Sequence, residues 1–119
     1  MIGKKRKLSP AGARLKGANF ERELVKRFKI VFPDYNVRRG FQSRSGTEAP
    51  DVETPVFWVE AKRGKKPSVR NALAQATSDA PKGRIPLVVV KDDRKRAHVT
   101  LDLDDFLEII GPWWANQNK

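Results

Sequence analysis

One short segment, residues 50–62, contains acidic and basic side chains whose spacing suits metal-dependent chemistry. Its second half, residues 56–62, is rich in valine and aromatic residues, which predicts a β-strand. Side chains alternate between the two faces of a strand, so Glu60 and Lys62 share one face, next to Trp58. Two charges at the end of an apolar run are costly unless they are paired or used.

Asp51 lies upstream of this strand, between two prolines that allow only a short or edge strand before the chain turns back. A tight reversal there brings Asp51 alongside Glu60, so that two carboxylates and the Lys62 ammonium meet at one end of a sheet. Carboxylate oxygens suit a hard divalent cation such as Mg²⁺, and a neighbouring lysine can orient a water and stabilise charge that develops at phosphorus. The alternative is a surface hairpin with a charged rim.

Composition limits the possible classes of protein. The chain has 119 residues, enough for one domain, and a formal net charge of +11. Such a charge points to a polyanionic partner, with nucleic acid the first expectation and an anionic membrane surface the second. The absence of cysteine excludes disulfides and a zinc finger. No apolar run approaches the roughly 18 residues of a membrane span, and the basic N-terminus lacks the apolar core of a signal peptide, so we expect an intracellular protein.

The order Pro50-Asp51, then Glu60-Ala61-Lys62 on an apolar strand, resembles the signature of the PD-(D/E)XK nuclease superfamily. Within it the chain is most similar to the archaeal-type Holliday junction resolvases and their viral relatives, over roughly residues 16–110. The resemblance implies an α/β, restriction-endonuclease-like core: a central mixed sheet of about five strands flanked by helices. We expect a basic arm at 1–16, a single nuclease domain at 17–111 and a tail at 112–119.

The same resemblance implies roles for individual residues. The expected ligands of Mg²⁺ or Mn²⁺ are the carboxylates of Glu21, Asp51 and Glu60, with the carbonyl of Ala61 as a possible further ligand. Lys62 would position or activate the attacking water, and Gln75 would support the site from a later helix.

Apolar spacing predicts the helices that carry Glu21 and Gln75. The first helix is expected from about Ala18 to residue 31 or 32, and Glu21 borders its apolar face without a cation at i+4. This lack of a partner favours a role for Glu21 outside the helix, whereas the alternative is an ordinary surface acid. Gln75 lies beside the small-residue stripe of a helix predicted at 69–80 and capped by Ser68; the alternative is an exposed polar residue.

The remaining elements follow from similar patterns. Strands are predicted at 35–41, 85–90 and 97–101, the second of them buried on both faces. A crossover helix between residues 62 and 85 implies a parallel pair in a mixed sheet. A last helix is expected at 103–110, closed by Gly111-Pro112, with an acidic corner that faces away from DNA. Trp113 and Trp114 in the tail either stack on bases or a partner, or fold back onto the core.

Basic side chains before, between and after these elements are the expected contacts to DNA phosphates. They lie in the arm, in the strand and polar loop before Asp51, and in the turn after Lys62; the alternative for each is a solvated surface. The candidates, with one serine, are Lys4, Lys5, Arg6, Lys7, Arg14, Lys16, Arg39, Arg44, Ser45, Arg63, Lys65 and Lys66.

Together these features predict a magnesium-dependent endodeoxyribonuclease, most specifically a Holliday junction resolvase of DNA recombination and repair. It would nick a four-way junction as a homodimer, because two symmetric strands require two sites. Hydrolysis would leave a 5′-phosphate and a 3′-hydroxyl, in the cytoplasm of a bacterial, archaeal or virus-infected cell, without a membrane partner. The alternatives are another nuclease of the superfamily, restriction-like or in repair, and a basic DNA-binding protein without catalysis.

Overall fold

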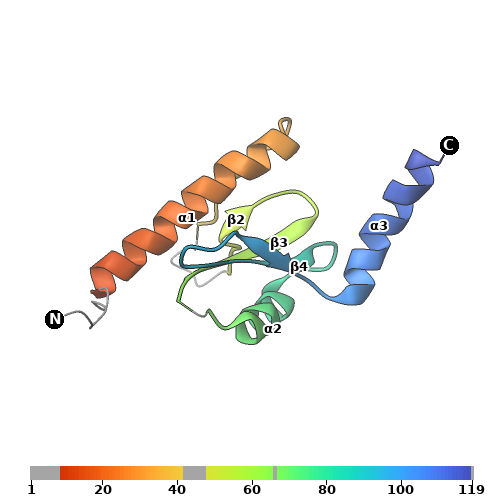
Figure 1. The fold of residues 1–119 in the computed structure, drawn as a ribbon. Helices are drawn as coiled ribbons and strands as arrows, with labels where there is room; N and C mark the ends of the chain where they lie inside the picture. Colours follow the sequence, from red (N-terminus) through yellow and green to blue (C-terminus); the bar gives the residue numbers. More distant parts are fainter. Residues whose placement is uncertain (1–8, 42–47, 66, 119) are drawn as a thin grey trace.

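The computed structural model describes residues 9–41, 48–65 and 67–118. Within them the chain forms three helices and five strands (Figure 1). In chain order these are α1 (Pro10–Val31), β1 (Arg38–Arg39), β2 (Val52–Glu53), β3 (Phe57–Gly64), α2 (Val69–Asp79), β4 (Ile85–Asp92), β5 (His98–Thr100) and α3 (Leu103–Gln117).

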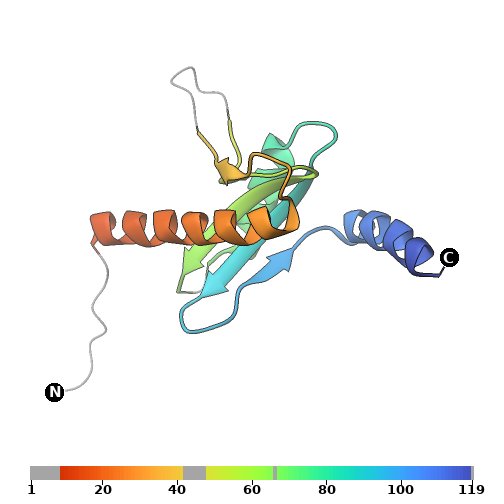
Figure 2. The ribbon, with the colours of Figure 1, turned by 90° about the horizontal axis from the view of Figure 1, so that it is seen from above.

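The five strands form one mixed sheet in the order β1-β2-β3-β4-β5. Neighbours pair antiparallel except β3 and β4, which are parallel and are joined by the crossover helix α2. Helix α1 covers one face of the sheet and α2 the other (Figures 1 and 2). The predicted α/β fold, with a central mixed sheet flanked by helices, is confirmed.

Each face of the sheet has its own hydrophobic core. Phe20 and Leu24 of α1 pack with Val59 and Val89 on one face, whereas Ala72 of α2 packs with Val88 on the other. Strand β4 therefore contributes to both cores through alternate residues, as its unbroken apolar run predicts. β3 lies in the middle of the sheet between the two helices, and it pairs with β4 along its whole length, including the second half that carries Glu60 and Lys62.

Helix α1 begins eight residues earlier than the apolar pattern predicts. Ser9 caps it by accepting a hydrogen bond of 3.0 Å from the Gly12 amide, and Pro10 occupies the first turn. Serine followed by proline is a favourable helix start, because the missing N–H of proline has no partner to lose there. The segment expected as a basic arm at 1–16 is therefore helical from residue 10, and Arg14 and Lys16 belong to α1.

Helix α3 extends to Gln117, beyond the predicted end at Ile110, and contains Pro112. Because proline has no N–H, the carbonyl of Glu108, four residues earlier, loses its helical hydrogen bond. Glu108 is exposed, so water can donate to this carbonyl instead. Trp113 and Trp114 lie in this helix and are 54% and 62% exposed, so neither folds back onto the core. α3 has no buried residue and projects from the body of the molecule (Figures 1 and 2).

The strands also differ in length from their predictions. The strand expected at 35–41 is reduced to β1, whose two arginines are both exposed, although Val37 before it is buried. β4 continues two residues beyond the prediction and β5 is three residues long. None of the described helices combines the length and apolar character needed to cross a bilayer.

Candidate active site

The hairpin of β2 and β3 places Asp51 opposite Glu60. Val52 pairs with Val59, and the Asp51 amide donates a 2.8 Å hydrogen bond to the Val59 carbonyl, so Asp51 is next along the antiparallel ladder. Strand β2 is only two residues long, as expected for a segment between two prolines. The predicted tight reversal therefore exists and brings the two acids together.

The reversal depends on a strained turn. Val56 has φ = 74°, which a β-branched residue rarely adopts, and the Phe57 amide donates to the Pro55 carbonyl at 2.8 Å in a γ-turn. The Val56 carbonyl in turn accepts from the Ile85 amide at 2.8 Å, which ties the turn to the start of β4. The neighbouring strand thus holds the turn in place.

The Asp51 carboxylate replaces a strand partner at the end of the ladder. Its Oδ2 accepts a 2.8 Å hydrogen bond from the Ala61 amide. In an antiparallel ladder this amide would donate to a main-chain carbonyl, and the carboxylate oxygen takes the place of that acceptor. The main chain of β3, one residue beyond Glu60, therefore orients the Asp51 carboxylate.

Glu60 is a buried acid with two side-chain neighbours on its own face of β3. The residue is only 9% exposed, and its Oε1 accepts a 3.2 Å hydrogen bond from the Trp58 indole. The pKa of Glu60 is raised to about 7, mainly by burial and then by the charge of Asp51 and a hydrogen bond with Asp51, against smaller lowering effects of Trp58 and Lys62. The two adjacent carboxyl groups thus hold a proton between them. When both are ionised, their oxygens are the ligands that a hard cation prefers.

Glu21 approaches the same region from α1. Burial raises its pKa, a hydrogen bond from Arg39 lowers it, and the charge of Asp51 raises it again. The Arg39 guanidinium lies 3.1 Å from Glu21 Oε1 and forms a partly exposed ion pair. Arg39 of β1 thus provides the cationic partner that Glu21 lacks within its own helix.

Asp51 accordingly lies near enough to Glu21 and Glu60 for its charge to act on both. The three acids come from three separate segments, as the sequence predicts. Among the described residues, however, no three acidic or histidine side chains lie close enough together to hold one metal ion. The carboxylate oxygens of the Asp51–Glu60 pair fit a divalent cation, whereas Glu21 is turned toward Arg39.

The other predicted site residues have different surroundings. Lys62 is exposed two residues beyond Glu60 on the same face of β3, and its charge favours the ionised form of Glu60. Ala61 contributes its amide to Asp51, and its carbonyl remains only an expected ligand. Gln75 is exposed, and its amide donates to Asp79 at 2.8 Å within α2, so the structure does not join it to the acids.

Gly40 is a residue of this site that the sequence patterns do not single out. Its amide donates to the Asp51 carbonyl at 3.0 Å, and a Cβ at this position would lie 1.5 Å from the Pro50 carbonyl oxygen. Only glycine permits so close an approach of two main chains. Trp58 is a further residue of this site: its alternation with Glu60 places both on one face of β3, where the indole donates to the carboxylate.

The predicted phosphate contacts separate into three groups. Arg14 and Lys65 are exposed, whereas Arg39 is paired with Glu21. Lys16, at 2.6 Å, and Arg63 both bind Asp93, and these bonds lower the Asp93 pKa to about 2. The remaining candidates lie outside the described residues: Lys4, Lys5, Arg6, Lys7, Arg44, Ser45 and Lys66.

The fold and the site together define a class: a basic α/β protein in which Asp51, just before β2, lies beside Glu60 on the central strand β3, with Lys62 two residues further along that strand. Comparison of the chain with protein-family models, with curated proteins and with solved structures found no match.

Proposed function

We propose that this protein is a metal-dependent endodeoxyribonuclease, and specifically a homodimeric resolvase of four-way DNA junctions. The observation that carries the proposal is the side-by-side placement of Asp51 and Glu60, with Lys62 following on the same face of β3. The net charge of +11 supports a nucleic acid as the substrate. The choice of a junction, and of a homodimer with two symmetric sites, rests on the family resemblance.

In this proposal Asp51 and Glu60 hold Mg²⁺ or Mn²⁺ through their carboxylate oxygens, with Glu21 and the Ala61 carbonyl as further expected ligands. The ion supplies Lewis acidity at the scissile phosphate. The Ala61 amide and the Trp58 indole keep the two carboxylates in place, so little reorganisation is needed when the substrate binds.

Lys62 holds the attacking water close to the phosphate and offsets the negative charge that develops there. The water oxygen forms a bond to phosphorus while the bond from phosphorus to the 3′ oxygen breaks, and the leaving oxygen takes up a proton. The products are a 5′-phosphate and a 3′-hydroxyl. Exposed cations such as Arg14 and Lys65 contact the DNA backbone without reading its sequence.

The sharpest test is Asp51→Asn, assayed on a labelled four-way junction and on a linear duplex of the same sequence. An asparagine oxygen still accepts the Ala61 amide, so the hairpin is preserved while one charge is lost. We expect magnesium-dependent nicking of the junction to fall by about 10²-fold or more, while junction binding persists. The matched control is Glu53→Gln, which removes an acid from the same short strand and leaves cleavage unchanged.

Two results would replace the proposal. Equal cleavage of the duplex and the junction would indicate another nuclease of the same superfamily. Absence of cleavage by the parent protein with Mg²⁺ or Mn²⁺, at unchanged DNA affinity, would indicate a binding protein without catalysis. The pairing of Glu21 with Arg39 favours this second candidate, because it shows that acids of the site can serve as partners of cations.

A further inference from the structure

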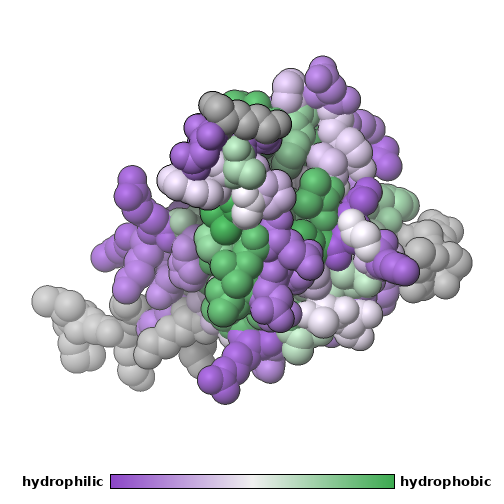
Figure 3. Space-filling view, turned by 90° about the vertical axis from the view of Figure 1, so that its right-hand side faces the viewer, coloured by the Kyte–Doolittle hydropathy of each residue, from purple (hydrophilic) through white to green (hydrophobic). Residues whose placement is uncertain are grey.

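Helix α3 carries an apolar stripe that none of the described residues buries. Its apolar residues recur at the spacing i, i+3, i+4 and i+7, so they share one face, and the acids of the helix lie mainly on the other. The stripe consists of Leu103, Phe106, Leu107, Ile110, Trp113 and Trp114. Figure 3, which faces the side from which α3 projects, shows hydrophobic surface bordered by hydrophilic side chains. Exposed tryptophans are enriched among the anchors of protein interfaces.

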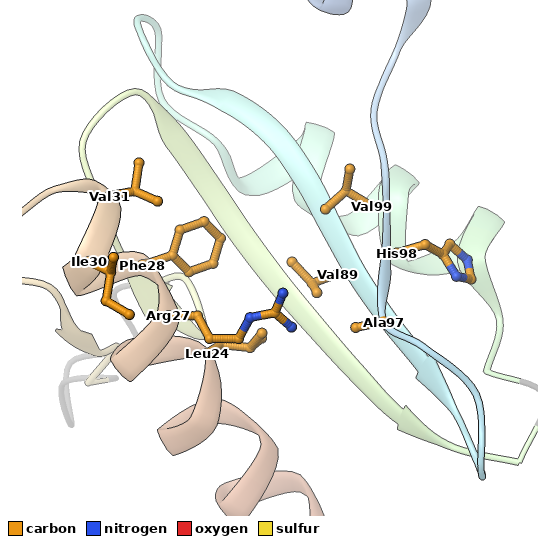
Figure 4. Close-up of a pocket in the computed structure, with 9 residues that line it drawn as sticks. All are labelled: Leu24, Arg27, Phe28, Ile30, Val31, Val89, Ala97, His98 and Val99. Carbon is orange, nitrogen blue, oxygen red and sulfur yellow. The ribbon is translucent and has the colours of Figure 1, made fainter.

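An apolar groove lies between α1 and β5, at the edge of the sheet from which α3 departs. It has a volume of about 370 Å³, and its apolar lining comes from Leu24, Phe28, Ile30, Val31, Val89 and Val99. Figure 4 shows the α1 side chains on one side of this groove and Val89 and Val99 on the other. Ile30 is 81% exposed and Val31 is 66% exposed, so the groove is open to a partner.

We infer that α3 is a dimerisation arm, whose apolar stripe binds the groove between α1 and β5 of a second copy of this chain. Each copy has one stripe and one groove, so a two-fold arrangement satisfies both at once. The inference does not depend on nuclease activity, but it supplies the surface for the dimer that the proposed function requires.

Charge complementarity favours this occupant of the groove. Residues 102–118 contain four acids and no lysine or arginine, so the rest of the chain carries a charge of +15. Arg27 lies at the groove, and the adjoining depression is lined by Lys91 and Arg96 with a single acid, Glu23. A membrane surface suits α3 poorly, because helices that bind anionic lipids carry lysine and arginine on their polar face.

The connection to β5 directs α3 away from its own groove. Only Leu101 and Asp102 separate Thr100, the last residue of β5, from α3, and Leu101 packs against the core. Asp102 has extended dihedral angles, and the helix leaves the body directly from it (Figure 2). The stripe is therefore presented to another molecule.

The area available is sufficient for a stable dimer. Phe106, Trp113 and Trp114 are 44%, 54% and 62% exposed. A large aromatic side chain buries roughly 150–250 Å², so these three would contribute about 300 Å² per helix. Two helices and the groove surfaces that face them would bury about 1,200 Å², which reaches the lower limit of standard specific interfaces before the leucines are counted.

The test measures the mass of the full chain in solution by sedimentation equilibrium, without DNA or metal, so that it is independent of nuclease activity. We expect the parent protein to be a dimer. Trp114→Glu on the stripe and Ile30→Glu in the groove should each raise the dimer dissociation constant by roughly tenfold or more. The matched controls are Ala115→Glu, on the opposite face of α3, and Lys29→Glu, the exposed neighbour of Ile30; both should remain dimeric.

Cross-linking then distinguishes exchange between copies from folding back within one copy. The chain has no cysteine, so Ile30→Cys and Leu107→Cys each introduce a single thiol. After the two variants are unfolded, mixed and refolded, a short bismaleimide should produce covalent dimers that contain one copy of each. All five substituted positions are exposed, and circular dichroism verifies that the variants fold.

Three results would overturn the inference. The first is a monomeric parent protein, whether α3 remains free, folds back onto its own groove or binds phosphatidylcholine–phosphatidylglycerol vesicles. The second is a dimer that Trp114→Glu and Ile30→Glu leave intact. The third is a failure of the mixed cysteine variants to form covalent dimers.

Discussion

The proton held by Glu60 gives a prediction that needs neither DNA nor metal. In the folded protein the pKa of Glu60 is raised from 4.5 to about 7, mainly by burial and then by Asp51. The folded state therefore binds this proton more tightly than the unfolded chain. The free energy of unfolding should fall as pH rises from about 4.5 to 7, and should be insensitive to this group below that window.

The size of the effect follows from the shift. A change of one pKa unit corresponds to about 1.4 kcal/mol, so Glu60 should lower stability by about 3 kcal/mol between pH 4.5 and pH 8. That is a large part of the stability of a typical domain, which is roughly 5–15 kcal/mol. The raised pKa of Glu21 makes the free energy of unfolding fall with rising pH in the same way. Asp93 has a lowered pKa of about 2, so the stability that it contributes is lost only as the pH falls from 3.8 toward 2.

Urea unfolding, followed by the fluorescence of the buried Trp58, measures this dependence at pH 5, 6, 7 and 8. Glu60→Gln retains an oxygen that accepts the indole hydrogen bond but cannot ionise, so its stability should change far less across the range. Glu53→Gln should keep the slope of the parent protein. If Glu60→Gln shows the same pH slope as the parent, the assignment of the proton to the Asp51–Glu60 pair is wrong.

Three further predictions concern the architecture of the site and its affinity for DNA. Gly40→Ala should destabilise the protein and abolish cleavage, because the new methyl group collides with the Pro50 carbonyl. Gly17 is helical and has open space around it, so Gly17→Ala should stabilise the protein by up to about 1 kcal/mol. Thermal unfolding compares the two variants. Trp58→Phe removes a hydrogen bond that lowers the pKa of Glu60, so the pH midpoint of magnesium-dependent cleavage should move upward in a pH–rate profile. Affinity for a four-way junction should fall linearly on a log–log plot against salt between 50 and 200 mM, by about 10³-fold or more if at least six phosphates are contacted; an affinity independent of salt would contradict the basic surface.

Local patterns predict much of this fold. The alternation of residues 56–62 predicts which face of β3 carries Glu60, and the unbroken apolar run of β4 predicts its burial on both sides. The crossover helix predicts the parallel pair. These properties depend on residues close together in sequence, where periodicity is informative.

The boundaries of the terminal helices could not be predicted in the same way. The composition of residues 9–12 favours a break in regular structure, but Ser9 accepts a hydrogen bond from the Gly12 amide and so begins a helix. Gly111-Pro112 usually ends a helix, but in α3 it lies on an exposed element where water can satisfy the freed carbonyl. Local signals of this kind depend on the environment in which they are placed.

The candidate site shows the same difference between features set by local sequence and features set by distant segments. Its acids are evident in the sequence because their types and order can be read directly, but the partners that set their charge come from distant segments. Arg39 binds Glu21 across 18 residues, and Gly40 admits the main chain of Pro50 and Asp51. Each of these contacts depends on how β1 lies against α1 and β2, which no periodicity in the sequence records.

The contrast between Glu21 and the Asp51–Glu60 pair suggests how a cation would assemble the full site. The pair is fixed by main-chain and indole hydrogen bonds, so it presents its oxygens without rearrangement once Glu60 loses its proton. Glu21 must first leave Arg39, and a partly exposed ion pair of this kind is worth only about 1 kcal/mol or less. Phosphate groups of bound DNA would compete for the same guanidinium. DNA binding would draw Arg39 away from Glu21 and so free Glu21 for the cation. Binding of the cation by Glu21 would in turn free Arg39 for a phosphate group, so the two events would favour one another.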